Sequence, residues 1–185
     1  MWDGSKATYM SLLITKPTVA LRDAFLRMVD DYDAYDPQTS KRYQQARPNF
    51  ATYVQGLHDD EQGLVGIVPY SHRWLVNPAV EMVVAVVRVR HHINSELLAN
   101  EFGHIGYDVA PSFRRRGYGV AALRAGLDQA AELGLERVLL YADTDNPASW
   151  RTIERCGGVL TAERYSDYYH CLVRQYWITI AKSKA

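Results

Sequence analysis

The spacing of apolar residues predicts a chain in which strands and helices alternate. The clearest helix begins at Val120, and its apolar face is formed by Leu123, Leu127, Ala130, Ala131 and Leu133. Gly134 follows where such a helix normally ends. The run from Met82 to Val89 is apolar and β-branched, continuous at first and alternating near Arg88 and Arg90. A continuous apolar run of this kind favours a strand that is covered on both faces.

The N-terminal segment is expected to contain a strand followed by two helices. Residues 9–15 are predicted as the strand, and a helix with Pro17 in its first turn follows, with a buried stripe of Leu21, Phe25, Met28 and Val29. Asn49 is expected to cap a second, short helix that reaches about Leu57. Residues 30–48 are predicted as a long loop or helix end, and residues 58–63 as a turn.

The rest of the chain is predicted to form a meander, a crossover and a closing hairpin. Strands are expected at residues 72–77, 103–109 and 137–142, with a loop at 91–102 and a final pair of strands at 159–164 and 170–180. The strand at 103–109, the helix and the strand at 137–142 make a parallel crossover, which is normally right-handed. Asn146 and Pro147 are expected to start another helix, which ends at Cys156-Gly157-Gly158.

Composition limits the kind of protein this can be. With 185 residues, 48% of them hydrophobic, residues 1–185 are expected to form one domain with a proper core. A formal net charge of zero argues against nucleic-acid and membrane partners for the surface as a whole. Two cysteines do not make a disulfide framework, residues 1–6 lack a signal-peptide core, and no apolar run has membrane-spanning length. We therefore expect a cytoplasmic location.

One stretch, residues 103–120, carries the strongest chemical signal. It predicts a strand, a loop stopped by Pro111, three consecutive arginines, and a turn with Gly117 and Gly119 that opens the long helix. A helix start has unpaired N–H groups and about half a positive charge. Glycines let a phosphate approach the backbone, and the arginines add forked donors. The pattern therefore predicts a site for a pyrophosphate or a similar anion.

The same residues resemble a known superfamily. The Val109-x-Pro111 step, the motif Arg114-x-x-Gly117-x-Gly119 and the helix opened by Asn146-x-x-Ser149 are similar to those of the GNAT superfamily of acyl-CoA-dependent N-acetyltransferases. Residues 90–94, 103–107 and 174–178 resemble a bacterial branch of predicted acetyltransferases. The resemblance covers roughly residues 82–180, and before that it extends mainly to the order of elements.

The resemblance implies a GNAT-like α/β fold with a mixed, splayed central sheet flanked by helices, using acetyl-CoA as co-substrate and no metal. Residues 82–180 would form the acyl-CoA-binding core, and residues 7–63 part of the acceptor side. Backbone groups near Tyr107 and Val109 would pair with the pantetheine arm, and one N–H of Asp108 or Val109 would stabilise the oxyanion. The residues implied in cofactor binding are Tyr107, Val109, Arg114, Arg115, Arg116, Gly117, Tyr118, Gly119, Val120, Asn146 and Ser149.

The acid and the base are less clearly marked. The superfamily often has a tyrosine acid seven residues after the asparagine, where this chain has Ile153. Substitutes are a water or a tyrosine from elsewhere, namely Tyr141, Tyr165, Tyr168 or Tyr169. Glu101 and His104 are the base candidates of equal weight, with His92 also near the strand.

We therefore expect acetyl transfer to a primary amine by direct attack in a ternary complex. The acceptor is expected to be an amine-bearing small molecule or peptide, and homodimerisation is left open. One alternative is a non-catalytic acyl-CoA-binding sensor or interaction module. The other is a dinucleotide-binding oxidoreductase, because Gly117-x-Gly119-x-x-Ala122 matches the nucleotide fingerprint. Residues 110–116 separate that motif from its strand, and this spacing argues against the oxidoreductase.

Overall fold

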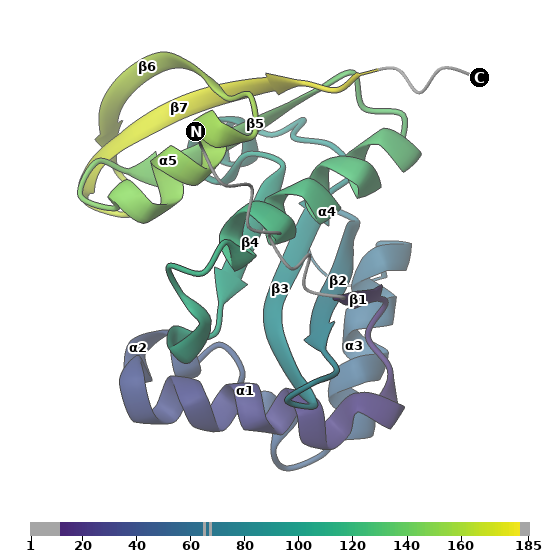
Figure 1. Ribbon diagram of the computed structural model, residues 1–185. Helices are drawn as coiled ribbons and strands as arrows, with labels where there is room; N and C mark the ends of the chain where they lie inside the picture. The colour runs from purple at the N-terminus through teal and green to yellow at the C-terminus, as the bar shows by residue number, and fades with distance from the viewer. Residues whose placement is uncertain (1–11, 65, 67, 182–185) are drawn as a thin grey trace, which may run out of the picture.

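The strands form two separate antiparallel sheets. The computed structural model describes residues 12–64, 66 and 68–181 (Figure 1). The first sheet has the order β1-β2-β3-β4, formed by β1 (Leu13–Thr15), β2 (Tyr70–Asn77), β3 (Met82–Arg90) and β4 (Ile105–Val109). The second has the order β5-β7-β6, formed by β5 (Arg137–Asp143), β6 (Val159–Ser166) and β7 (Cys171–Thr179). This confirms the predicted α/β fold with splayed strands. Each ladder among the described residues is antiparallel, so β4 and β5, the two strands of the predicted parallel crossover, diverge without forming a ladder.

Helices cover both faces of the first sheet. The N-terminal ones are η1 (Val19–Leu21), α1 (Arg22–Tyr35), α2 (Pro37–Ser40), η2 (Gln44–Ala46) and α3 (Phe50–Gln62). The later ones are η3 (Leu98–Phe102), η4 (Pro111–Phe113), α4 (Tyr118–Glu132) and α5 (Pro147–Arg155). α1 and α3 contact β3 and β2, while α4 packs on β3 and β4 from the opposite face (Figure 1). On that face, Gly126 of α4 approaches Val87 and Ile105 so closely that an added Cβ would lie 3.0 Å from each.

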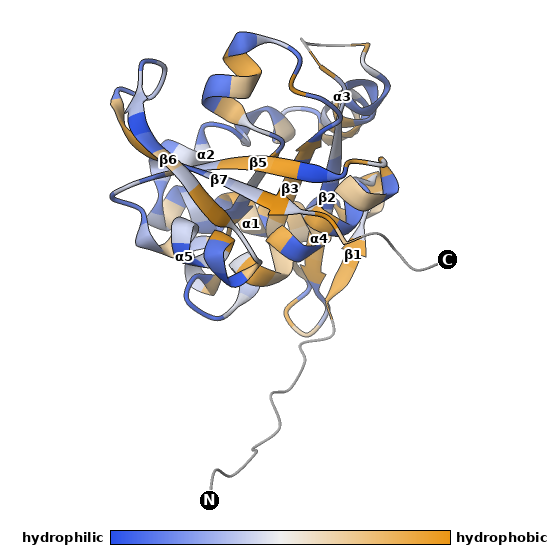
Figure 2. Cartoon of the chain, turned by 90° about the horizontal axis from the view of Figure 1, so that it is seen from above, coloured by the Kyte–Doolittle hydropathy of each residue, from blue (hydrophilic) through white to orange (hydrophobic). Residues whose placement is uncertain are grey.

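The core is continuous between these layers. β3 is buried from Met82 to Val87, as expected for a strand covered on both faces. Rings from α1, α3 and β2 meet beneath it, with Phe25 and Trp74 only 4.6 Å apart between centroids. Figure 2 shows hydrophobic residues along β5 and a mixture of hydrophobic and hydrophilic residues along α4 and α5. The latter is the pattern of helices that bury one face and expose the other.

Local capping signals were predicted correctly in three helices. The side chains of Asn49 and Asn146 accept hydrogen bonds from the backbone N–H groups of Thr52 and Ser149. Gly134 has a φ of +76° just after α4, which is the conformation that glycine adopts without strain. The predicted face of α4 needs one correction, because Ala131 is exposed. Its buried residues are Tyr118, Ala122, Leu123, Ala125, Gly126, Gln129 and Ala130.

Five details of the elements differ from the predictions. Pro17 precedes the N-cap residue Thr18 and so lies outside the first turn. α1 continues to Tyr35 and is followed by α2 and η2, so most of residues 30–48 is helical, and α3 runs on through the predicted turn to Gln62. The predicted loop at residues 91–102 contains the π-helical turn η3. The predicted strand at 9–15 is observed from Leu13, and residues 9–11 lie outside the described residues.

Candidate active site

A large groove runs between the two sheets. Its volume is about 1310 Å³, and it is lined by β4 and β5 together with parts of α4, α5, η3, β3 and the segment around α2. We call one part the helix side, formed by Arg115, Gly117, Gly119, Val120, Asn146, Pro147, Ala148, Ser149 and Thr152. We call the other part the arginine side, formed by Asp36, Thr39, Arg42, Arg88, Arg90, Glu101, Phe102, Tyr168 and Tyr169.

The groove begins where β4 and β5 diverge. The backbone N–H of His104 donates to the Leu139 carbonyl at 2.7 Å, and the Leu139 N–H donates to His104 Nδ1 at 2.9 Å. Beyond this point the strands belong to different sheets, so each is an edge strand that faces the groove. Edge strands present unpaired N–H and C=O groups, which an extended ligand can use.

The register of β4 decides which backbone groups face the groove. His104 O accepts from Arg90 N at 2.8 Å, and Ala110 N donates to Val84 O at 2.9 Å. Because backbone groups alternate in direction along an antiparallel strand, those of Asp108 point toward β3 and those of Tyr107 and Val109 point away from it. Asp108 and Val109 are the two candidates for the oxyanion contact. Of these, Val109 is the one whose N–H points into the groove.

The start of α4 lies on the helix side. Gly117 is its N-cap residue, with a φ of +86°, and a Cβ added there would meet no atom within 4 Å. The space above this turn is therefore open to a ligand. At Gly119 an added Cβ would lie 3.4 Å from Thr152 Oγ1. The first N–H groups of a helix of this length favour an anion, and Arg115, which lines the groove, adds positive charge.

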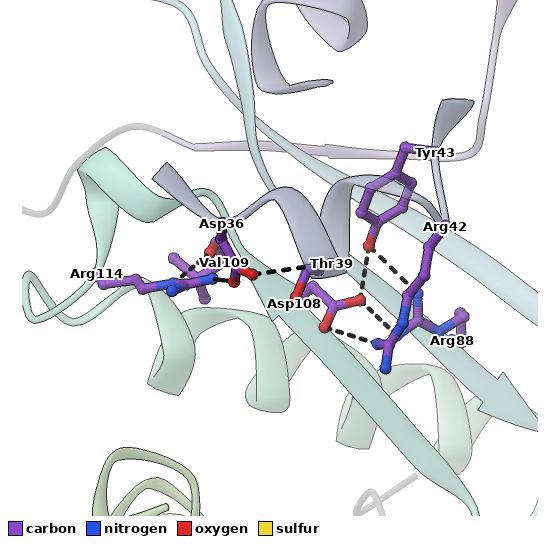
Figure 3. A network of polar contacts seen from close by, with 8 residues as sticks. All are labelled: Asp36, Thr39, Arg42, Tyr43, Arg88, Asp108, Val109 and Arg114. Atoms are coloured by element: carbon purple, nitrogen blue, oxygen red, sulfur yellow. Dashed lines mark hydrogen bonds and ion pairs between the residues drawn. The ribbon is translucent and has the colours of Figure 1, made fainter. Parts of the chain in front are cut away.

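The three predicted arginines lie in different surroundings. Arg114 Nη2 donates to Asp36 Oδ2 at 2.6 Å and its Nε donates to the Val109 carbonyl at 3.1 Å, so its side chain braces the loop (Figure 3). Arg116 lies 5.6 Å from the centroid of the Phe113 ring and is not a groove residue. Arg114 and Arg115 are both exposed and both line the groove, but the guanidinium of Arg114 is held by Asp36 and the Val109 carbonyl. Of these two groove residues, Arg115 is therefore the one whose guanidinium is better placed to contact a ligand.

The side chain of Tyr118 is buried in the protein, whereas that of Val120 lies at the groove. The Tyr118 side chain is buried, accepts a hydrogen bond from Asn77 Nδ2 at 2.9 Å and packs against Phe113. Its part in the predicted site is therefore limited to its backbone N–H. Val120 lines the groove one turn into the helix.

α5 forms the opposite wall of the helix side. Asn146 Oδ1 accepts from the Ser149 N–H at 3.1 Å, and both residues line the groove. The hydroxyl of Tyr107 reaches across from β4, 3.4 Å from the Ser149 carbonyl oxygen and 3.5 Å from its Oγ. Burial raises the pKa of Tyr107, against hydrogen bonds to Ser149 and Thr152 that lower it. Ile153 is fully buried and turned away from the groove, so α5 offers no acid at that position.

A compact ion-pair network centred on Asp108 lies on the arginine side (Figure 3). Arg88 Nη2 donates to Asp108 Oδ2 at 2.7 Å, and the Tyr43 hydroxyl donates to the same oxygen at 2.6 Å. Arg42 lies 3.4 Å from the other carboxylate oxygen. Burial opposes the charge of Asp108, but Arg88 and the hydrogen bonds outweigh it and hold the pKa of Asp108 below its usual range. Asp108 is thus a structural anion.

Glu101 is the carboxylate of η3 that faces the groove. Its Oε1 lies 3.4 Å from Arg164 Nη1, and its Oε2 accepts a short hydrogen bond from the Ser166 hydroxyl. Both contacts come from β6, so the second sheet fixes the carboxylate. Glu101 is placed within reach of a ligand in the groove.

His104 is not suited to act as a base. It is buried and does not line the groove, and its Nδ1 lone pair is already used by the Leu139 N–H. Burial, Arg90 and His92 lower its pKa to about 4. A neutral imidazole with that hydrogen bond must carry its proton on Nε2, which leaves no nitrogen free to accept another. We therefore withdraw His104 as a base candidate, and His92 is likewise not a groove residue.

The tyrosines considered as acids fall into three groups. Tyr141 lines the groove, but its hydroxyl donates to the Ala99 carbonyl at 2.7 Å. Tyr168 and Tyr169 line the arginine side, with ring centroids 4.9 Å apart. Tyr165 is exposed and does not line the groove.

Sequence reasoning missed Arg42, Arg88 and Arg90 as groove residues. The available signal was the alternation of Arg88 and Arg90 at the end of an otherwise apolar strand, which places both on one face. Among residues 12–64, 66 and 68–181, no group of three or more His, Cys, Asp or Glu side chains is arranged to hold a metal ion. In the same ranges, the helices are too short or too polar to cross a membrane.

Comparison with known proteins identifies the family. Residues 20–158 match the model of the Acetyltransferase (GNAT) family, and the chain therefore belongs to that family. A stretch of 49 residues is 49% identical to the mycothiol acetyltransferase of Mycobacteroides abscessus, covering 26% of this chain and 17% of that protein. The chain thus matches only a small part of the length of that curated relative.

Solved structures agree on the fold. A ribosomal L7/L12 alpha-N-protein acetyltransferase in complex with coenzyme A gives a TM-score of 0.64 at 19% identity, over 93% of this chain and 96% of that one. A Salmonella typhimurium acetyltransferase solved with its cofactor acetyl-CoA gives 0.60 at 13% identity, over 95% and 97%. The ribosomal-protein-S5-alanine acetyltransferase from Vibrio fischeri gives 0.62 at 14% identity, over 93% and 94%.

Proposed function

We propose that this chain transfers the acetyl group of acetyl-CoA to a primary amine, by direct attack within a ternary complex. The observation that carries the proposal is the groove itself, in which the open edge of β4 leads from the start of α4 into the space between the sheets. Family membership supports acetyl transfer, and two of the similar structures hold coenzyme A or acetyl-CoA.

The helix side fits the diphosphate of the co-substrate. The backbone N–H groups of residues 115–120 lie at the start of α4, where an anion is favoured. The open space above Gly117 leaves room for phosphate oxygens to approach the backbone. Arg115 supplies a charged donor beside them.

The arm of the co-substrate would follow the edge of β4. Pantetheine contains amide groups, which can pair with the backbone groups of Tyr107 and Val109 as an additional strand does. Asn146 and Ser149 would contact the arm from α5. Residues 107–109 and 146–149 would therefore bind and orient the pantetheine arm. Its acetyl end would then be directed toward the arginine side.

Two groups would serve the attack by the amine. The amine nitrogen forms a bond to the thioester carbon, the carbon–sulfur bond breaks, and a proton leaves the nitrogen. The N–H of Val109 stabilises the negative oxygen that forms during attack. An amine with a pKa of about 10 must lose its proton at a cost of about 4 kcal/mol at pH 7, and Glu101 is the carboxylate placed to receive a proton.

The departing sulfur needs less help than the amine. A thiol with a pKa of about 8.5 leaves as thiolate at pH 7 at a cost of about 2 kcal/mol. The hydroxyl groups of Tyr107 and Ser149 lie together on the helix side and can supply that proton. They take the place of the acid that Ile153 cannot provide.

Direct attack is favoured over an acyl-enzyme because the groove lacks an activated nucleophile. Neither Cys156 nor Cys171 is among its lining residues. Ser149 lines it, but among the described residues its hydroxyl contacts the Tyr107 hydroxyl and its N–H donates to Asn146 Oδ1, and neither partner is a base.

The binding half of the proposal is tested with a matched pair of glycine variants. Gly117 and Gly134 both have positive φ and open space around a new Cβ, so Gly117→Val and Gly134→Val carry similar backbone strain. We expect the Kd of coenzyme A, measured by calorimetry, to rise about 100-fold in Gly117→Val alone, since a side chain would occupy the phosphate position. Wild-type affinity in Gly117→Val would place the diphosphate elsewhere.

The catalytic half is tested by thiol release. Acetyl-CoA is incubated with the protein and a panel of primary amines, and free thiol is measured with and without each amine. Amine-dependent release, with the acetylated amine identified by mass, is the expected result. Tight binding of coenzyme A with no amine-dependent release would instead indicate the non-catalytic module.

A further inference from the structure

The charged side chains on the arginine side do not balance. Arg42 and Arg88 share the single carboxylate of Asp108. Asp36 forms an ion pair with Arg114, and Glu101 forms one with Arg164. Arg90 takes part in none of the ion pairs formed among residues 12–64, 66 and 68–181. This part of the groove therefore carries an excess of positive charge.

Arg90 is held in place without an anion. Its Nη1 donates to the Gly103 carbonyl at 3.2 Å, and its guanidinium carbon lies 5.2 Å from the centroid of the Phe102 ring. The side chain is half-buried at the end of β3 and lines the groove. A stacked guanidinium has its donors fixed in one plane, and that arrangement suits a carboxylate, which accepts two parallel hydrogen bonds.

The neighbours of Arg90 make an anion favourable there. Arg88 lies two residues before it on the same face of β3, and burial together with Arg88 lowers the pKa of Arg90. Burial, Tyr168 and Asp143 raise the pKa of Tyr169, whereas Arg90 and Arg42 lower it, so all these groups face one region. In that region Arg42, Arg88 and Arg90 outnumber the carboxylates of Asp108 and Asp143. A ligand carboxylate would relieve the repulsion between the arginines.

We propose that the acceptor is an amine that also carries a carboxylate, and that Arg90 binds this carboxylate. The inference rests on the proposed acetyl transfer and names its substrate class. Arg90 is then a specificity-determining residue, and Arg42, which is exposed and only 3.4 Å from Asp108, is the second cation near the ligand.

The test compares amines that differ only in the carboxylate. Each pair has similar amine basicity: 4-aminobutyrate with butylamine, 5-aminopentanoate with pentylamine, and 6-aminohexanoate with hexylamine. The three lengths vary the separation between the amine and the carboxylate. We expect wild-type protein to prefer the carboxylate member of at least one pair by about 10-fold or more in kcat/KM.

Variants then assign the preference to Arg90. Arg90→Gln should lose about 30-fold in kcat/KM for the preferred carboxylate and little for its partner amine, with Arg90→Lys in between. The matched control is Arg137→Gln. Arg137 also stacks on a ring, 4.3 Å from the centroid of Trp177, but it lies outside the groove. The control should keep the wild-type preference, and all variants should keep the wild-type Kd for coenzyme A.

The outcomes separate the two proposals. Amine-dependent release with no preference within any pair overturns the assignment to Arg90 and leaves acetyl transfer standing. An equal loss for both members of a pair in Arg90→Gln also overturns it, because that is the effect of a structural role. No release with any of the six amines counts against the proposed transfer to simple primary amines itself.

Discussion

Replacing Gly103 by alanine should weaken the point at which the two sheets join. Gly103 precedes β4 with φ of +63° and ψ of −162°, a combination that is essentially restricted to glycine. A Cβ added there would lie 2.5 Å from the Leu139 carbonyl oxygen and 3.0 Å from its carbon. That carbonyl is the one that accepts the hydrogen bond of the His104 N–H. The substitution therefore acts on both strands that border the groove.

The expected magnitude follows from three contributions. An L residue in this backbone region costs about 1–3 kcal/mol. Displacing a packed backbone carbonyl costs about another 1–3 kcal/mol, and weakening its hydrogen bond about 1 kcal/mol. Together these amount to about 5 kcal/mol, a large share of the 5–15 kcal/mol that typically stabilises a domain.

Urea unfolding of Gly103→Ala and Gly134→Ala measures the difference. Gly134 also has positive φ, but an added Cβ there meets nothing within 4 Å, so its cost is limited to backbone strain of about 1–2 kcal/mol. Gly103→Ala should therefore lose at least twice as much free energy of unfolding as the control, or fail to fold where the control folds. Equal losses would show that the contact with Leu139 does not constrain the join.

Three further substitutions test individual side chains. Glu101→Gln should lower kcat about 100-fold with little change in the Kd of coenzyme A, measured by thiol release and calorimetry, and an unchanged pH profile would remove Glu101 as the base. Tyr107→Phe should lower kcat about 10-fold or more while Ser149 and the backbone of β4 still bind the arm, and wild-type kcat would leave a water or Ser149 as the acid. Asp108→Asn should cost about 3 kcal/mol of stability at pH 7, because Arg88 loses its partner. Since the folded pKa of Asp108 is lowered, its contribution is present above about pH 4 and is lost as the pH falls through the folded pKa, so the difference from wild type should shrink in acid urea titrations.

The elements that were predicted correctly are those determined by nearby residues. β3 follows from a continuous β-branched run. The C-terminal end of α4 follows from Gly134 and the start of α5 from Asn146, and the effect of each residue acts within one turn. The segment around α2 was not predicted, because its helices depend on distant partners. Tyr43 is buried by contacts with Phe25 and with Asp108, which lies 65 residues away.

The same distinction between nearby and distant partners explains which residues of the groove could be predicted. The helix side comes from two short stretches of sequence, residues 115–120 and 146–152, so its glycines and the asparagine at the start of α5 could be identified as local motifs. The arginine side combines residues from β3, η3, the segment after α2 and the tip of the closing hairpin. Arg42 and Asp108 are 66 residues apart, and no local pattern connects them. The burial and tautomer that disqualify His104 likewise depend on β5.

The groove remains open because β4 and β5 belong to different sheets and form no ladder with each other. Arg114 already binds the carbonyl of Val109, and the side chain of Tyr107 extends to α5, where Ser149 meets its hydroxyl. β5 in turn has its ladder with β7, and its one backbone contact with the β4 segment is made before β4 begins. The N–H groups of Tyr107 and Val109 thus face a space that the protein itself does not fill. An extended molecule with its own amide groups can satisfy them there, and we expect it to gain affinity from a backbone edge that is already fixed on its other side by β3.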